Sequence, residues 1–274
     1  MAEHRYLTVG GVHTHYVAAG KGPPLLLLHG LGASSVAWSA NIAPLSQRYS
    51  VYALDIPGHG DSDKPDIDYQ VPAGARFIRA FMHVLGINRA SLAGNSMGGM
   101  LALRTALEFP HLVEKLVLVD AAGLGRELGW SVRLLSLPLA GEILEDTSLR
   151  GTGAMLRRIF YDRSFVQEGL LQELHRTRRM PGAKEAVLKT VRGAVSLRGL
   201  RKEWVMVEAL KSLDAPVLIV WGAQDRIVPV RHAHNAARLA PDVRLCIFDG
   251  CGHWPQMEKS SQFNQVVLEF LSGE

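Results

Sequence analysis

Near the middle of the chain stands Ala90-Ser91-Leu92-Ala93-Gly94-Asn95-Ser96-Met97-Gly98-Gly99. Its first four residues form an apolar run that predicts a short buried strand, and a helical pattern begins at Gly98. Between them lies Gly94-x-Ser96-x-Gly98, the spacing of a nucleophile elbow, a sharp strand-to-helix turn that exposes one reactive side chain. Both glycines are needed because a Cβ there would collide with the flanking strand or helix. The motif therefore predicts Ser96 as a nucleophile above the end of a strand.

Short apolar or alternating runs recur along the chain and alternate with helical patterns. They predict strands at 6–9, 12–18, 25–28, 51–54, 90–93, 116–119, 217–221 and 243–248. The run from Leu25 to Leu28 has no polar face, which indicates a strand buried on both sides. This alternation predicts an α/β fold with a doubly wound, mostly parallel sheet.

Residues 123–213 have a different pattern, without a strand candidate. Their periodicity predicts helices at 153–161, 165–179, 183–197 and 204–210. We therefore expect a core made of residues 1–122 and 214–274, with residues 123–213 inserted as a helical cap, or lid. Because ligands bind at the carboxyl ends of strands in such sheets, the cap is expected to roof the site.

A serine hydroxyl becomes a good nucleophile only when a base takes its proton and an acid orients that base. His253 lies in a glycine-rich turn after the last predicted strand, and Asp225 follows the strand before it. Both are expected at the same sheet edge as Ser96, so the three residues form a predicted catalytic triad. Asp120 also follows a strand and remains an alternative acid. Asp249 is too close to His253 in sequence to reach its ring comfortably.

The oxyanion that forms on attack needs preorganised hydrogen-bond donors. The backbone N–H groups of Met97, after the nucleophile, and Leu31, after His29-Gly30, are the natural pair. We interpret His29 and His59 as structural residues of loops.

The remaining histidines do not indicate a metal site. His13 and His15 share one strand face, but the sequence shows no third ligand beside them. His232 and His234 fall on a predicted helix, where a spacing of two residues points the rings apart. We therefore expect no metal and no cofactor.

Composition narrows the possible partners. The chain has 30 Lys/Arg and 26 Asp/Glu, but residues 123–202 hold 15 of the basic and 8 of the acidic ones, a net charge of +7. Without a nucleic-acid-binding module, this asymmetry indicates a solvated helix surface or a mild attraction for anionic substrates or interfaces. Apolar runs are too short for a membrane span, two cysteines exclude a disulfide framework, and no leader precedes the first strand. A cytoplasmic protein, monomeric or dimeric, is expected.

Several motifs together resemble the α/β-hydrolase superfamily over nearly the whole chain outside residues 123–213. They are the elbow, His29-Gly30, the loop Asp55-x-Pro57-Gly58-x-Gly60-x-Ser62, Asp225 and His253. The segments Gly94–Gly99 and Cys251–Glu258 resemble, within it, the meta-cleavage-product (C–C bond) hydrolases, which split vinylogous 1,5-diketones. That resemblance implies a substrate pocket with Gly30, Asn95, Trp254 and, as the nearest counterpart of a lid arginine, Arg176. Ala40 stands where that subfamily has an asparagine.

The expected function is that of a serine hydrolase acting on a small molecule. A carboxylesterase for small apolar acyl esters is favoured, because a triad and oxyanion amides suffice for ester hydrolysis. Apolar residues between 134 and 160 are candidates to line the pocket, although most are expected to pack within the cap. A C–C bond hydrolase is the alternative, favoured by Asn95, Met97, Trp254 and the basic cap, and a slow or non-catalytic small-molecule receptor is a third. Ser96 argues against epoxide hydrolases and haloalkane dehalogenases, which use an aspartate nucleophile.

Overall fold

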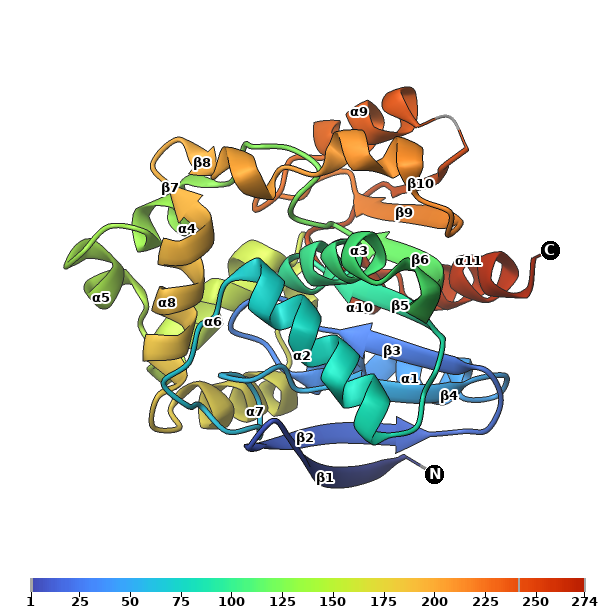
Figure 1. Cartoon of the computed structure of the whole chain (residues 1–274). Coiled ribbons are helices and arrows are strands. Elements are labelled where there is room, and N and C mark those ends of the chain that lie inside the picture. The colour runs from blue at the N-terminus through green and yellow to red at the C-terminus, as the bar shows by residue number, and fades with distance from the viewer. Residues whose placement is uncertain (1, 241, 274) are drawn as a thin grey trace.

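The computed structural model describes residues 2–240 and 242–273, and its centre is an eight-stranded sheet (Figure 1). The strand order is β1-β2-β4-β3-β5-β6-β9-β10. Neighbours pair in parallel except at β1–β2 and β2–β4, which are antiparallel. The strands are β1 (Glu3–Val9), β2 (Val12–Ala19), β3 (Pro24–Leu28), β4 (Ser50–Leu54), β5 (Ala90–Asn95), β6 (Val113–Val119), β9 (Val217–Gly222) and β10 (Arg244–Phe248). The predicted α/β fold with a mostly parallel sheet is confirmed.

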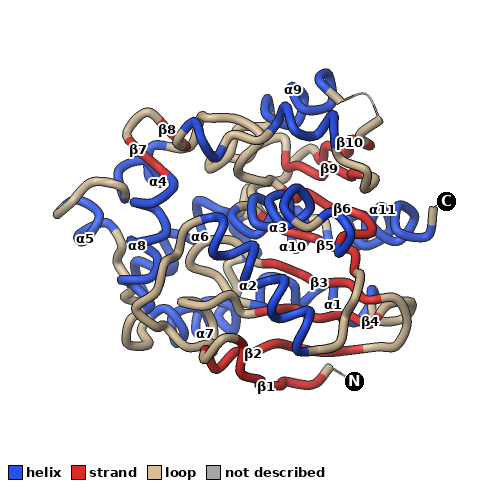
Figure 2. The backbone as a smooth tube through the Cα atoms, in the orientation of Figure 1, coloured by secondary structure: helices blue, strands red, loops and turns tan. Residues whose placement is uncertain are grey.

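Helices cover both faces of the sheet, as the tube view shows (Figure 2). On one face pack α2 (Val71–Val84), α3 (Met97–Glu108) and α9 (Arg231–Leu239); on the other, α1 (Ser39–Leu45) and α11 (Ser260–Ser272). Short helical turns complete the core: η1 (Ser35–Trp38), η2 (Pro110–Leu112) and α10 (Pro255–Glu258).

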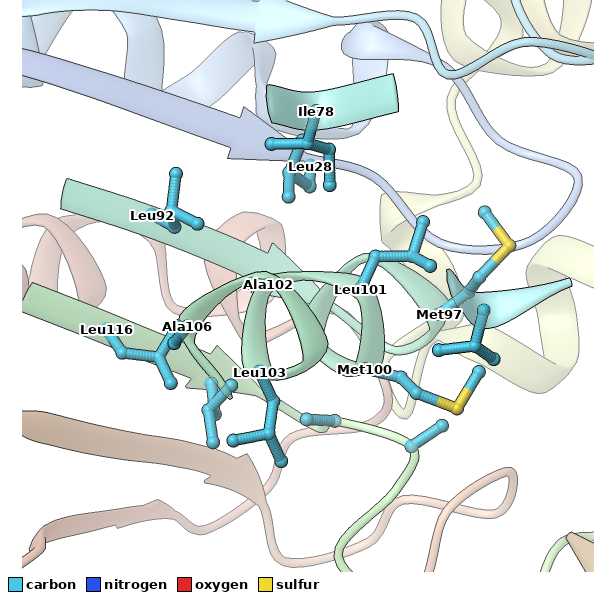
Figure 3. Packing of buried hydrophobic residues seen from close by; sticks show 14 of the residues in the cluster. Leu28, Ile78, Leu92, Met97, Met100, Leu101, Ala102, Leu103, Ala106 and Leu116 are labelled. Atoms are coloured by element: carbon cyan, nitrogen blue, oxygen red, sulfur yellow. The ribbon is translucent and has the colours of Figure 1, made fainter. Parts of the chain in front are cut away.

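The central strands send alternate side chains to the two faces, as a pleated strand requires. In β3, Leu26 and Leu28 join the cluster under α2 and α3, whereas Leu25 and Leu27 join the cluster under α1 and α11. Figure 3 shows the first cluster, in which Leu92 and Leu116 lie beside the buried side chains of α3. Both faces are therefore dry, which explains why these strands have no polar side in the sequence.

Residues 123–213, here called the insert, are mainly helical. They contain α4 (Trp130–Leu135), α5 (Ala140–Leu144), α6 (Leu149–Ile159), α7 (Glu168–Arg178), α8 (Ala183–Ala194) and the turns η3 (Arg163–Phe165), η4 (Lys202–Trp204) and η5 (Val207–Ser212). Two differences from the sequence-based expectation appear. A two-residue hairpin of β7 (Val195–Ser196) and β8 (Gly199–Leu200) follows α8, separate from the main sheet, because Gly199 turns the chain with φ +101°. Helices α4 and α5 were not predicted, because their own apolar residues lie on more than one side of each helix and give no helical period.

No helix in residues 2–240 and 242–273 is both long enough and apolar enough to cross a bilayer.

Candidate functional site

The turn between β5 and α3 has the strained geometry of a nucleophile elbow. Ser96 has φ 56° and ψ −117°, a backbone conformation that costs an ordinary residue about 1–3 kcal/mol. A Cβ on Gly94 would lie 2.3 Å from the Gly98 carbonyl oxygen, and one on Gly98 would lie 2.2 Å from the Leu28 carbonyl oxygen. The two glycines are therefore required by the close packing of α3 against β5 and β3.

His253 and Asp225 meet at the carboxyl ends of the strands. The His253 Nδ1 and the Asp225 Oδ2 are 2.7 Å apart, with both side chains almost wholly buried. The other Asp225 oxygen accepts hydrogen bonds from the amides of Ile227 (2.7 Å) and Val228 (3.1 Å). The His253 amide donates to the Ile159 carbonyl of the insert at 2.7 Å. The carboxylate is thus fixed on both oxygens, and it holds the imidazole through Nδ1 so that Nε2 remains for a substrate or nucleophile.

A cavity of about 760 Å³ lies between the sheet edge and the insert. The core contributes Gly30, Leu31, Asn95, Ser96, Met97, His253 and Trp254 to its wall. The insert contributes mainly apolar side chains, among them Trp130, Leu134, Leu135, Ile143, Leu144, Met155 and Ile159. Ser96 and His253 therefore share one cavity of a size typical for small-molecule ligands.

The expected oxyanion donors lie beside Ser96. A Cβ on Gly30 would come within 3.2 Å of the Ser96 Cβ, so only glycine lets this loop approach the serine so closely. In residues 2–240 and 242–273, no acceptor is bound by the amide of Leu31 or by that of Met97, the first residue of α3. Both amides are thus available to a ligand oxygen.

Asp120 lies near both Asp225 and His253, but the carboxylate that contacts the His253 Nδ1 is that of Asp225. Asp120 is fully buried, and its Oδ1 accepts the Gly222 amide at 3.1 Å. Burial and the charge of Asp225 raise the pKa of Asp120 well above its usual range. No donor among the described residues reaches the Asp120 Oδ2, as expected if that oxygen carries its own proton. Of the two acids considered from the sequence, Asp225 is the one bonded to His253.

Asn95 and Trp254 both line the cavity, with different surroundings. The Asn95 side-chain amide donates to the carbonyls of His253 (3.0 Å) and Val119 (3.3 Å), so it ties the elbow to the histidine loop. Trp254 is buried edge-on against Phe160 of the insert, with 5.6 Å between ring centroids. Its indole therefore forms part of the apolar wall.

The loops after β3 and β4 are held by a buried polar network. His29 accepts the Ile56 amide through Nε2, and burial lowers its pKa, so the ring stays neutral. Burial also lowers the pKa of His59 to about 3. Asp55 accepts the amides of Ser35 and Asp61, and a Cβ on Gly60 would lie 2.1 Å from its Oδ2. These contacts fit the structural interpretation of both histidines.

Of the two arginines of α7, Arg176 and Arg178, it is Arg178 that reaches the cavity. Arg176, the counterpart expected from the sequence, is half exposed outside the cavity wall and pairs with Asp61 (2.6 Å) and Glu173 (2.7 Å). Arg178 is buried in the wall, where it pairs with Glu145 at 2.8 Å. Its Nε has no acceptor among the described residues, and its Nη1 lies against Gly32 of the oxyanion loop. Arg176, Arg178 and Arg179 lie within four positions at the end of α7, so only the orientation of the helix in space distinguishes them.

Among the residues that the structure describes, two side-chain groups lie close enough to share an ion: His15 with Asp55 and Asp61, and Asp120 with Asp225 and His253. The first supplies the carboxylates that the sequence did not show beside His15. Its members are already bonded to one another or to protein, with His15 Nδ1 and Asp55 Oδ2 2.7 Å apart. We interpret both groups as hydrogen-bond networks.

Asn41, which the sequence did not single out, is buried behind the histidine loop. It donates to the Gln256 carbonyl and to the Asn264 side chain, both at 2.8 Å. It thus joins α1 to α10 and α11. Ala40 stands where the resemblance implies an asparagine, and the neighbouring position carries one.

Comparisons with known proteins agree with this architecture. A family model described as the alpha/beta hydrolase fold matches residues 23–260. A 2-hydroxy-6-oxononadienedioate/2-hydroxy-6-oxononatrienedioate hydrolase of Comamonas testosteroni is 33% identical over 266 residues, covering 94% of this chain and 91% of the relative. The meta-cleavage product hydrolase of Pseudomonas fluorescens IP01 aligns with a TM-score of 0.84 and 29% identity, over 98% of this chain and 97% of that one. A carboxylesterase of Bacillus subtilis aligns with a TM-score of 0.79 and 27% identity, over 100% and 93%.

Proposed function

The chain belongs to the alpha/beta hydrolase fold family, and from this premise we propose that it is a serine hydrolase, a carboxylesterase for small apolar acyl esters. Ser96 is the nucleophile, His253 the general base and Asp225 the acid that orients the imidazole. The observation that carries the proposal is the 2.7 Å contact between His253 and Asp225 beside a cavity that Ser96 also lines. Such an arrangement is the one that acyl transfer through a serine requires.

In the acylation step, the Ser96 hydroxyl attacks the ester carbonyl while the His253 Nε2 takes its proton. Asp225 stabilises the imidazolium that forms. The amides of Leu31 and Met97 stabilise the negative charge on the former carbonyl oxygen, and one such donor contributes about 3–4 kcal/mol to lowering the barrier. His253 then returns the proton to the leaving alcohol, and the acyl group remains on Ser96.

In the deacylation step, water enters where the alcohol left. His253 takes a proton from this water, the resulting hydroxide attacks the acyl carbonyl, and the same two amides stabilise the oxyanion. Collapse expels the Ser96 oxygen, which regains its proton from His253 and releases the carboxylic acid.

We assign the insert, residues 123–213, as the cap that closes the cavity over the core, residues 1–122 and 214–274. Its apolar side chains supply the acyl pocket. This placement is supported by Ile159, whose carbonyl accepts the His253 amide, and by Phe160, which packs on Trp254.

The charges in the cavity favour an uncharged substrate. Arg178 is the buried arginine of the wall, and Glu145 compensates its charge at 2.8 Å. Arg158 and Arg226, which also contribute to the wall, are exposed to solvent. A substrate carboxylate that approached Arg178 would have to compete with Glu145.

The second candidate is hydrolysis of a C–C bond in a meta-cleavage product. The specific observation in its favour is the free Nε of Arg178, which offers a donor to a substrate carboxylate or enolate oxygen. The names of two relatives, a meta-cleavage product hydrolase and a dienedioate hydrolase, point in the same direction.

A parallel assay separates the two. The protein would be offered a series of p-nitrophenyl esters and a 2-hydroxy-6-oxo-dienoate, the latter followed by loss of its absorbance. We expect the larger kcat/KM for the esters; a larger value for the dienoate would establish the second candidate instead. Steady turnover, at a rate well above one event per minute, would eliminate a receptor function.

A second experiment tests the nucleophile. Ser96→Ala should abolish labelling by a fluorophosphonate and lower kcat by at least about a thousandfold. Ser131→Ala is the matched control, because Ser131 also lines the cavity. Persistent labelling of the Ser96→Ala protein would show that another serine is the nucleophile.

A further inference from the structure

The outer part of the insert exposes a cluster of large apolar side chains. Leu139 is 79% exposed, Ile143 78% and Trp130 65%, and Leu144 beside them is also exposed. We call these four residues of α4, α5 and their connection the apolar edge. Contiguous exposed apolar surface on a protein marks a place that contacts another apolar surface.

The side chains of the apolar edge are not buried against other parts of the insert. None of the side chains of α4 is buried, and on α5 only Gly141 is. Leu139 also has φ 62°, one of three positive values among the described non-glycine residues. A leucine that is both strained and exposed contributes little to folding, and such strain persists where it serves a function.

The apolar edge is continuous with the catalytic cavity. Trp130, Ile143 and Leu144 belong to the cavity wall as well as to the exposed surface. Figure 1 shows α5 projecting from the body of the molecule, with α4 between it and the core. An apolar molecule could therefore pass from the surface to Ser96 along apolar side chains.

Several cations lie beside this edge. Residues 123–202 carry a net charge of +7, while the rest of the chain carries −3. Arg133 stacks over the Trp130 ring at 3.9 Å, and Lys184 and Arg192 both contact Glu142, the single acidic residue of α4 and α5. Exposed apolar side chains with cations beside them are typical of proteins that lie in the headgroup region of an anionic lipid surface.

We propose that the apolar edge inserts into the surface of a lipid assembly that contains anionic headgroups, and that the ester substrate enters the cavity from that lipid. The second half rests on the serine hydrolase function proposed above. The cations hold the headgroups by attraction, the four apolar side chains leave water for the acyl region, and the cavity faces the source of its substrate.

Co-sedimentation with vesicles tests the binding step. We expect the protein to bind vesicles of phosphatidylglycerol and phosphatidylcholine at 50 mM salt, and to bind pure phosphatidylcholine at least tenfold more weakly. Raising the salt to 500 mM should weaken binding to the anionic vesicles, because screening reduces the attraction. Vesicles should also protect tryptophan fluorescence from acrylamide, since Trp130 is the most exposed indole.

Leu139→Glu identifies the surface, with Val84→Glu on α2 as the matched control. Both residues are exposed, and neither lines the cavity, so both proteins should fold and hydrolyse a soluble ester like the wild type. Leu139→Glu should lose at least tenfold in affinity for anionic vesicles, and Val84→Glu less than twofold. Equal losses in the two variants would overturn the proposal.

Two other outcomes would also overturn it. The first is hydrolysis of soluble esters by a wild-type protein that does not bind vesicles, a result that leaves the serine hydrolase function intact. The second is a dimer, measured by sedimentation velocity, that Leu139→Glu dissociates while vesicles remain unbound; the apolar edge would then be an interface between two copies. Vesicle binding without ester hydrolysis would instead keep the surface and refute the esterase.

Discussion

Strand β3 and the α4–α5 region are both rich in leucine but place it in opposite environments. In β3, Leu25 to Leu28 are fully buried between two layers of helices. On α4 and α5, no large side chain is buried. The difference teaches that the apolar residues of the sheet stabilise the fold through burial, whereas the exposed ones of α4 and α5 bury little surface and are those that we propose for contact with a lipid surface.

The proposed chemistry divides along the same boundary. The triad and oxyanion donors lie on the core, at strand ends and in loops fixed by buried polar networks. The insert contributes the apolar wall and the Arg178–Glu145 pair. Changes in the core should therefore act on kcat or on stability, and changes in the insert on KM and substrate choice.

The largest expected effect is at the two core aspartates. Asp225→Asn should lower kcat by about ten-thousandfold, because the amide favours the wrong tautomer of the imidazole. Asp120→Asn should change kcat less than threefold, since an asparagine is uncharged, as the raised pKa of Asp120 favours, and can still accept the Gly222 amide. Ester hydrolysis under single-turnover conditions measures both. Comparable losses would mean that Asp120 must ionise during catalysis.

The next effect contrasts burial in the two regions. Leu27→Ala should lower the free energy of unfolding by about 2–5 kcal/mol, the usual range for a leucine removed from a packed core. Leu139→Ala should change it by less than about 0.5 kcal/mol, as for most exposed positions. Urea unfolding of both variants under one condition gives the comparison. A similar loss for Leu139→Ala would show that the apolar edge stabilises the fold after all.

A smaller effect is expected at the cavity wall. Glu145→Gln removes the charge that compensates Arg178, so KM for a monoanionic ester such as p-nitrophenyl hemisuccinate should fall about tenfold relative to the neutral p-nitrophenyl butyrate. Glu173→Gln is the control, because Glu173 pairs with the exposed Arg176 instead. An unchanged ratio in Glu145→Gln would show that the substrate does not contact Arg178.

The sequence predicts the core well because its signals are local. Ser96 lies at the predicted elbow, and every strand expected in the main sheet is present. These strands are easy to recognise because burial on both faces makes runs such as Leu25–Leu28 continuously apolar. Asp225 and His253 could be placed because parallel strands bring their carboxyl ends to one edge. The raised pKa of Asp120 could not be predicted, because it arises from burial and from a second carboxyl group 105 positions along the chain.

Prediction was weaker in the insert for a physical reason. In α4, Val132 and Leu135 pack against the core, while Trp130 is exposed, so apolar residues lie on more than one side of the helix and a 3.6-residue pattern is not visible. The choice of Arg176 over Arg178 depended on the rotation of α7, which is set by contacts with Glu145, Met155 and Asp61 from distant segments. Apolar residues between 134 and 160 were candidates to line the pocket; Leu134 and Ile143 do line the cavity, whereas Leu156 and Phe160 are buried.

A last predicted effect is a pH dependence of the free energy of unfolding that belongs to Asp120. Because the pKa of Asp120 is raised in the folded state, folding takes up a proton at this site as the pH rises above the ordinary range of an aspartate, near 4. The folded state therefore loses stability between that pH and the folded-state pKa, at up to about 1.4 kcal/mol per pH unit. Asp120→Asn removes this term while every other carboxylate is kept. The variant should match the wild type near pH 4 and become progressively more stable than it at pH 5 and pH 6, as measured by urea unfolding at each pH. A difference that stays constant with pH would mean that Asp120 is ionised in the folded protein, and a neutral Asp120 beside Asp225 would have to be abandoned.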